Sequence, residues 1–314
     1  MQISYFKTAW RDIRDSPGWF GKLVTLALVG LIPIFGWIVI LGYLYGWARE
    51  MAWGVHEPLP ERIFGNKEGG LYSRGLYALV IVFVCSLVPS LLEGLLSAVL
   101  NVTAIGAGIG GATLAPLLLM VAGLHAALSL IIFLFSLFIE LFQWVGTMRM
   151  SIYGRLSAGF QLRKIWSMIK HDWRGLLRIL GMAVLMTLVA LVVVAAIVAV
   201  AIVILGLGFF ISNGFEVSSI SEILNIETFK GRFGMVALVL IVLIAAGFVI
   251  MAMITFIEMM VARAMGYWTM QFDVANWRGQ DDPMPFEMEG RYGGGRGAGG
   301  AYGGGWGTGG GSAW

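Results

Sequence analysis

The strongest constraint on this chain is a set of long apolar segments that carry almost no charge. The run from Ile179 to Ile211 contains no charged residue, and it is longer than the roughly 20 residues that a helix needs to cross a bilayer. In the whole chain 59% of residues are hydrophobic and 12% are charged, about half the charged share of a soluble domain. The sequence therefore predicts an all-α, polytopic membrane protein. Its apolar segments are residues 23–47, 76–100, 117–145, 179–211 and 235–262.

Three parts are predicted along the chain. Residues 1–20 contain an amphipathic interfacial helix, in which basic side chains lie opposite an apolar face formed by Ile3, Phe6, Trp10 and Ile13. Residues 21–270 form the helical transmembrane domain. Residues 271–314 form a tail rich in glycine and aromatic residues, which cannot bury a core and is expected to be disordered when isolated. We expect the tail to become ordered only against a partner or a second copy, through Tyr292, Tyr302, Trp306 and Trp314.

The first apolar segment is interrupted at residues 31–36 and permits two interpretations. It is either one kinked span or a re-entrant hairpin that turns between Pro33 and Gly36. The hairpin places nearly all of the 21 Lys and Arg residues on one side of the membrane, which is the distribution that cytoplasmic loops show. We therefore favour four full spans plus a re-entrant segment, with the N-terminus and the tail both cytoplasmic.

The connector of residues 149–178 is basic, with Asp172 as its single acid. Ile165, Met168, Ile169 and Leu176 recur at helical spacing, while basic residues gather on the opposite face. This pattern predicts an interfacial helix that contacts anionic lipid headgroups. The residues expected to make these contacts are Arg149, Arg155, Arg163, Lys164, Lys170, Arg174 and Arg178.

A two-fold internal repeat is suggested by short matches in parallel order. Arg74-Gly75-Leu76 opens the second apolar segment, and Arg174-Gly175-Leu176 opens the fourth. Phe138-Ile139-Glu140 and Phe256-Ile257-Glu258 stand near the ends of the third and fifth segments. Each half would then consist of a surface helix followed by a transmembrane hairpin.

Carboxylates inside apolar helices are the main candidates for function, because a charge there is costly and usually faces a partner or water. Glu140 and Glu258 lie near the cytoplasmic ends of their spans. Either each pairs with a following arginine, Arg149 or Arg263, or the two carboxylates couple to an ion or a substrate.

Two further polar residues lie within the apolar segments. Glu93 is expected at the outer interface of its span, where a carboxylate costs less free energy than at the centre of the bilayer. His125 either forms a hydrogen bond between helices or acts with a membrane carboxylate as a proton relay.

No pattern of residues indicates catalysis. The only cysteine is Cys85, no histidine pair has the spacing of a metal site, and no serine or cysteine nucleophile has a base nearby in the sequence. The glycines of residues 106–111 fit a dinucleotide motif as a string, but they follow a membrane span instead of a strand. We expect no enzyme activity, no cofactor, no metal and no nucleic-acid partner.

Three stretches resemble one known family. They are Ile32-Pro33 followed by Gly42-Tyr43-Leu44, Glu57-Pro58-Leu59-Pro60-Glu61 with the later Gly70-Leu71, and the connector from Tyr153-Gly154-Arg155-Leu156-Ser157 through Phe160 and Ile165. With these the chain resembles domain of unknown function 4013, a family of integral membrane proteins of bacteria and archaea. The resemblance implies a multi-pass helical protein of a prokaryotic plasma membrane and no known activity.

Two functions are consistent with these features. The favoured one is a non-enzymatic component that organises or accompanies other membrane components, with membrane lipids and a membrane protein or a second copy as its partners. The alternative is a small transporter or channel-like protein that uses Glu140 and Glu258.

Overall fold

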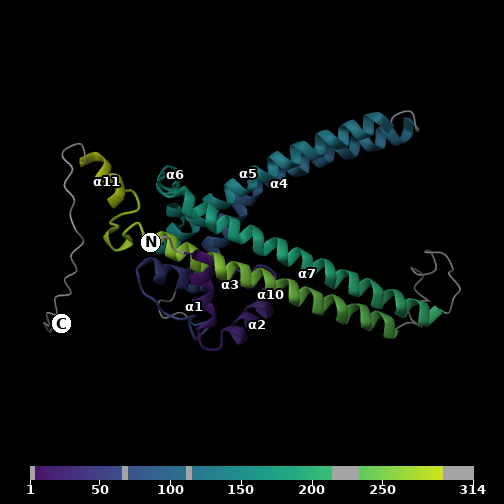
Figure 1. Ribbon diagram of the computed structural model, residues 1–314, viewed down its shortest axis with the longest axis horizontal. Coiled ribbons are helices and arrows are strands. Elements are labelled where there is room, and N and C mark those ends of the chain that lie inside the picture. The colour runs from purple at the N-terminus through teal and green to yellow at the C-terminus, as the bar shows by residue number, and fades with distance from the viewer. Residues whose placement is uncertain (1–3, 66–69, 111–114, 214–232, 293–314) are drawn as a thin grey trace.

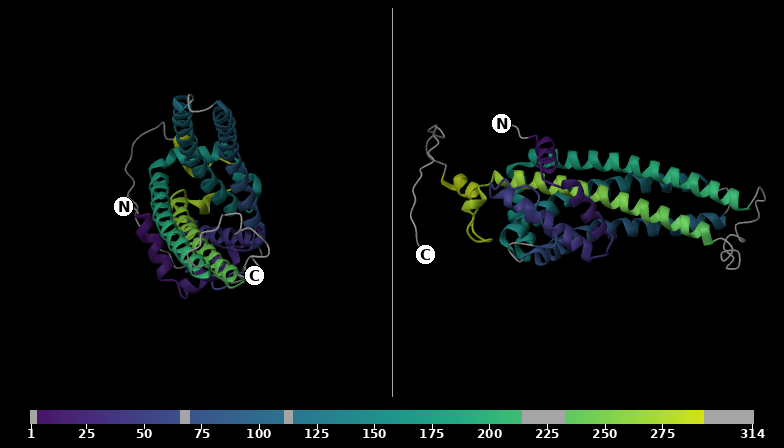
Figure 2. Two further views of the ribbon diagram at one scale, coloured as in Figure 1. Left: turned by 90° about the vertical axis from the view of Figure 1, so that its right-hand side faces the viewer. Right: turned by 90° about the horizontal axis from the view of Figure 1, so that it is seen from below.

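The computed structural model describes residues 4–65, 70–110, 115–213 and 233–292, and every regular element in these ranges is a helix. Two long hairpins, α4/α5 and α7/α10, start from a common base and diverge beyond it (Figure 1), and a second view shows the same separation (Figure 2). The prediction of an all-α fold with four long apolar helices is confirmed. These helices are α4 (Leu71–Gly110), α5 (Ala115–Tyr153), α7 (Trp173–Asn213) and α10 (Phe233–Met270).

The long helices have a buried end and an exposed arm. Among the described side chains, burial on them is confined to the base: it ends at Ile81 on α4 and Ala183 on α7, and it begins at Leu141 on α5 and Thr255 on α10. Beyond these points each helix continues as an apolar arm of roughly 20–30 residues, or about 30–45 Å, which matches the hydrocarbon thickness of a bilayer. The four arms are therefore the membrane-crossing parts, and the base lies at one membrane surface.

The first apolar segment folds as a helical hairpin, the form that the re-entrant interpretation predicts. Helix α2 (Trp19–Gly30) turns at residues 31–34 into α3 (Phe35–Ala52), and α2 is too short to span a bilayer. The turn lies two residues earlier than predicted, and Gly36 belongs to α3, where a Cβ atom would collide with the carbonyl oxygen of Val29. Apolar side chains at the tip are exposed, among them Ile32 at 50% and Ile34 at 68%, as expected of a tip that dips into lipid.

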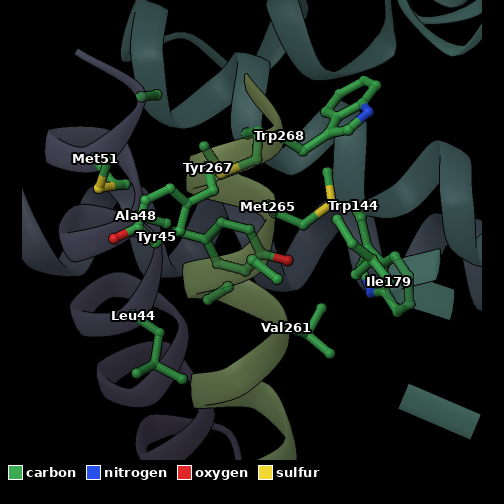
Figure 3. Packing of buried hydrophobic residues seen from close by; sticks show 14 of the residues in the cluster. Leu44, Tyr45, Ala48, Met51, Trp144, Ile179, Val261, Met265, Tyr267 and Trp268 are labelled. Atoms are coloured by element: carbon green, nitrogen blue, oxygen red, sulfur yellow. The ribbon is translucent and has the colours of Figure 1, made fainter. Parts of the chain in front are cut away.

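The core of the base forms where α3, α5, α7 and α10 meet. Figure 3 shows Tyr45 and Ala48 on the side of α3 that faces α10, and Met265 of α10 extending toward Trp144 of α5. Helices α3 and α10 approach closely at Gly266, where a Cβ atom would lie only 2.6 Å from the carbonyl oxygen of Ala48. The absence of a side chain at this position therefore lets the re-entrant hairpin pack against the second transmembrane hairpin.

The basic connector contains η2 (Leu156–Phe160) and α6 (Leu162–His171). Ile165, Met168 and Ile169 are buried on one face of α6, as the sequence predicts. The predicted single helix is wrong beyond His171, because Asp172 interrupts it and caps the next helix: its Oδ1 accepts a hydrogen bond of 3.0 Å from the backbone N–H of Gly175. Leu176 is also buried, but it belongs to α7.

The N-terminal helix α1 (Tyr5–Arg14) is present, but its buried face differs from the predicted one. Tyr5, Ala9 and Ile13 are buried, whereas Phe6 is 49% exposed. The reason is that α1 packs on α10 and not only on lipid: Trp10 makes an edge-to-face contact with Phe256 at 5.7 Å between ring centroids.

The tail does not begin where it was predicted. Residues 271–292 fold against the base as η3 (Val274–Asn276), a short loop and α11 (Pro285–Tyr292). Phe272, Val274 and Met284 are buried there, so this stretch carries its own apolar anchors. Tyr302, Trp306 and Trp314 of the predicted tail lie outside the described residues.

Candidate functional site

Glu140 and Glu258 come together at the junction between the arms and the base. Both side chains are half-buried, on α5 and α10, and their carboxylates interact electrostatically with each other. The Trp144 side chain is directed at Glu140, and Tyr45 of α3 interacts electrostatically with both carboxylates. Glu140, Glu258 and Tyr45 are therefore within electrostatic reach of one another, and we name these three residues the carboxylate cluster.

Within the part of the chain that the structure describes, neither carboxylate pairs with an arginine, so the interpretation in which Glu140 binds Arg149 and Glu258 binds Arg263 is wrong. Among the described residues both guanidinium groups are directed away, toward partners in the base. Each arginine follows its glutamate along the helix and therefore lies deeper in the base. There the guanidinium group has hydrogen-bond acceptors that are closer than the glutamate.

Arg149 is fully buried at the base end of α5. Its Nη2 donates to Oε1 of Gln161 at 2.7 Å and to the carbonyl oxygen of Gln280 at 3.2 Å. The guanidinium carbon also lies 5.3 Å from the ring centroid of Tyr153 and 5.6 Å from that of Trp277. Arg149 was predicted to contact lipid headgroups; that prediction is wrong, because carbonyl oxygens and ring faces of the protein replace the headgroups around its charge.

Arg263 is the corresponding buried arginine of α10, with 2% of its side chain exposed. Its Nε donates to Oδ2 of Asp12 on α1 at 2.7 Å, and the same oxygen accepts a 2.6 Å hydrogen bond from the Tyr267 hydroxyl. The guanidinium carbon stacks 4.3 Å from the ring centroid of Trp47. The carboxylate and the indole together compensate the buried charge and fix α1 on the base.

Glu93 and His125 face the partner helix of the first hairpin. Oε1 of Glu93 accepts a 2.9 Å hydrogen bond from the hydroxyl of Ser129, which joins α4 to α5. His125 lies one turn from Ser129 on α5, and its buried Nδ1 has no hydrogen-bond partner. The contacts do not support the predicted relay between His125 and a carboxylate.

The rest of the basic connector remains available to lipid. Arg155, Arg163, Lys170, Arg174 and Arg178 are exposed. Lys164 is instead engaged by the C-terminal segment, where its Nζ lies 2.8 Å from Oε2 of Glu287. Headgroup contact therefore stays a prediction for the exposed residues.

The base also contains a cavity of about 830 Å³ that the sequence did not indicate. It lies between the second half of α3, residues 57–65 and the first turn of α4, and its lining includes Arg49, Glu50 and Arg74. A second cavity, of about 380 Å³, is lined by Tyr153 and Trp277. Neither cavity is lined by Glu140 or Glu258. Within the described ranges, no group of three or more His, Cys, Asp or Glu residues could hold a metal ion.

Comparison with known proteins agrees with this architecture. Residues 25–202 match the family described as protein of unknown function (DUF4013). The chain belongs to this family. The match covers the second half of α2, all of α3, the first transmembrane hairpin, the connector and most of α7, and so it includes the 830 Å³ cavity and Glu140. No curated protein and no solved structure matches the chain.

Proposed function

We propose that this protein is a non-enzymatic organising or accessory component of a prokaryotic plasma membrane. The observation that carries the proposal is the divergence of the two transmembrane hairpins, which pack together only at the base (Figures 1 and 2). Helices of multi-span membrane proteins usually gain stability by packing on one another along the bilayer. Because the two hairpins separate, their lateral surfaces do not cover each other. These surfaces can therefore contact a helical partner or a second copy.

The exposed arm surface supports the same function. Side chains such as Leu91 and Phe133 in the first hairpin, and Leu188 and Ile244 in the second, are more than half exposed. These surfaces are apolar and come from both helices of each hairpin. The arms can therefore contact lipid or another membrane protein along most of their length without rearrangement of the base.

The sidedness of the protein follows from charge. Helix α1 and the C-terminal segment both pack at the base, so with four spans the described ends of the chain lie on one side of the membrane. The exposed basic residues of the connector lie on the same side, which the positive-inside rule assigns to the cytoplasm. Each of these residues near an anionic membrane surface contributes about 1 kcal/mol to membrane attachment.

Site-specific photo-crosslinking in native membranes tests the proposal. A photoreactive residue at Leu91 or Leu188 should give discrete protein adducts, either with another membrane protein or with a second copy. The same residue at Leu162, which is 64% exposed on α6 in the base, is the matched control and should give a different pattern. Lipid adducts alone at both arm positions would contradict an organising function.

Transport is the second candidate, and the carboxylate cluster favours it. Two carboxylates and a tyrosine hydroxyl at the membrane junction have the composition of a site that exchanges protons or binds a cation. Ion flux into vesicles containing the purified protein, compared with Glu258→Gln and with the control Glu93→Gln, decides this question. Flux that only Glu258→Gln abolishes supports transport, and the absence of flux with the unaltered protein rejects it.

A further inference from the structure

The 830 Å³ cavity has charged side chains arranged in two layers. Arg49, Glu50 and Arg74 form its inner layer; Arg74 is buried and the other two are half-buried. The outer rim is exposed and contains Glu57, Glu61 and Arg62. The inner layer therefore has an excess of positive charge, and the rim has an excess of negative charge.

The position of Arg74 is set by glycines at the crossing of α3 and α4. A Cβ atom at Gly42 or Gly75 would collide with the backbone of the other helix, so the two helices approach to backbone contact. A Cβ atom at Gly46 would collide with Nη1 of Arg74. The Arg74 side chain therefore lies across α3 at Gly46, next to Arg49, which follows almost one turn later.

The inner layer is suited to an anion. Burial lowers the pKa of Arg49 to about 10, and the nearby Arg74 guanidinium acts in the same direction while Glu50 opposes it. Glu50 acts electrostatically on both guanidinium groups, so two positive charges face one negative charge in the inner layer and favour a further anion. Guanidinium groups donate paired hydrogen bonds to phosphate oxygens with well-matched geometry.

The cavity lies at the depth of lipid headgroups. Tyr72 and Leu76, on either side of Arg74 in α4, are 47% and 46% exposed, so the outward apolar surface of this helix begins here. The ring of Tyr72 stacks on Phe35 of the re-entrant hairpin, with 6.1 Å between the ring centroids. Exposed aromatic side chains of this kind concentrate at membrane–water interfaces.

We propose that this cavity binds the headgroup of a phospholipid that carries both a phosphate and a primary ammonium group. The phosphate lies at Arg49 and Arg74, and the ammonium group donates hydrogen bonds to the rim carboxylates of Glu57 and Glu61. Phosphatidylethanolamine has this chemistry. Phosphatidylglycerol offers no cation to the rim, and the methylated ammonium of phosphatidylcholine has no N–H to donate. The site is separate from the surfaces of the proposed organising function and does not depend on it.

Native mass spectrometry of the full-length protein, released from bilayer discs that contain equal amounts of the three phospholipids, tests the proposal. The unaltered protein should retain phosphatidylethanolamine in preference to the other two. Arg49→Gln and Arg74→Gln should each weaken this retention roughly ten- to a hundredfold, because each removes a charged hydrogen-bond donor to phosphate. Arg278→Gln is the control, since Arg278 is exposed on the C-terminal segment, outside this cavity and outside the residues predicted to contact headgroups, and it should retain lipid like the unaltered protein.

Two further measurements separate the parts of the proposal. Combined Glu57→Gln and Glu61→Gln substitutions should remove the preference for phosphatidylethanolamine over phosphatidylglycerol without abolishing phospholipid binding. Added inorganic phosphate at millimolar concentration should not displace the lipid; displacement would indicate a soluble phosphate ligand and overturn the lipid assignment.

Two results would refute the proposal. One is equal retention of all three lipids by the unaltered protein, and the other is unchanged retention in Arg49→Gln. Both remain decisive if Arg74→Gln fails to fold, because neither depends on that variant.

Discussion

Replacing Asp12 with asparagine tests whether the buried charge of Arg263 determines the stability of the base. Oδ2 of Asp12 lies 2.7 Å from Nε of Arg263, and the side chains of Asp12 and Arg263 are 16% and 2% exposed, respectively. The same helix provides a matched control, because Asp15 pairs with Arg14 at 3.2 Å while both side chains are more than half exposed. Asp12→Asn and Asp15→Asn thus make the same chemical change in a buried and an exposed ion pair.

The two substitutions should differ in magnitude. Removal of one partner of a buried pair leaves an uncompensated charge and costs about 3–5 kcal/mol of unfolding free energy. An exposed pair contributes about 0–1 kcal/mol. We therefore expect Asp12→Asn to be less stable than Asp15→Asn by at least about 2 kcal/mol. The stacking of Arg263 on Trp47 remains in the variant and keeps the loss near the lower end of the range.

Equilibrium unfolding of the protein in bicelles measures both variants under the same conditions. A double variant with Asp12→Asn and Arg263→Met should regain part of the lost stability, because it removes the uncompensated charge as well as its partner. If Asp12→Asn and Asp15→Asn had equal effects, or if the double variant were less stable than Asp12→Asn alone, the charge of Arg263 would not be the determining factor.

Three other predictions follow from single contacts. Burial alone raises the pKa of Glu287, but hydrogen bonds, one of them from Lys164, outweigh it and leave this pKa below its usual value. The carboxylate therefore stabilises the docked C-terminal segment above about pH 4.3, and this contribution is lost as the pH falls through the lower folded-state pKa. The rate of amide hydrogen exchange in residues 279–290 should therefore increase at acid pH. Lys164→Met should make this increase smaller. Gly75→Ala should lower the free energy of unfolding by at least about 1–3 kcal/mol, because the new Cβ would collide with the α3 backbone. Gly94 has open space around it, so Gly94→Ala should leave the free energy of unfolding unchanged or raise it in the same assay. Reporters sensitive to compartment, fused to each end of the chain, should both report the cytoplasm; opposite sides would require the first apolar segment to cross.

Local patterns in the sequence were sufficient for much of the fold. The spacing of Ile165, Met168 and Ile169 predicts the buried face of α6, because helical periodicity alone brings these residues together. Pro33 marks the turn of the first hairpin, and the distribution of Lys and Arg favours a segment that does not cross the membrane. Both signals can be read from the residues of the segment and its flanks. Such properties do not require knowledge of distant contacts.

Contacts between distant segments could not be predicted in this way. Arg149 was assigned to the membrane surface because its neighbours in the sequence are basic, yet one of its acceptors is Gln280, far along the chain. The same limitation explains the early start assigned to the tail. The polar residues Asp281 and Glu287 of this segment are bound by side chains on other elements: Nε2 of Gln161 donates to Asp281, and Nζ of Lys164 donates to Glu287.

One relation between the two halves becomes apparent only in the structure. Each hairpin has a buried arginine at its base end, and each arginine lies against the tyrosine that follows four residues later, Tyr153 for Arg149 and Tyr267 for Arg263. The Arg-x-x-x-Tyr pattern is visible in the sequence, but only the structure shows that the arginine of each pair is buried against the tyrosine ring.

The two buried arginines also explain how the ends of the chain contribute to the fold. Arg263 of the second hairpin is bound by α1, near the start of the chain, and Arg149 of the first hairpin is bound by the C-terminal segment at Gln280. Each hairpin is thus held at its base by a segment distant from it in the sequence. Because the two hairpins separate beyond the base, the angle between them is determined by these contacts and by the core around α3 and α10. A membrane partner that contacts both hairpins would therefore meet them at an angle that is set by the contacts in the base.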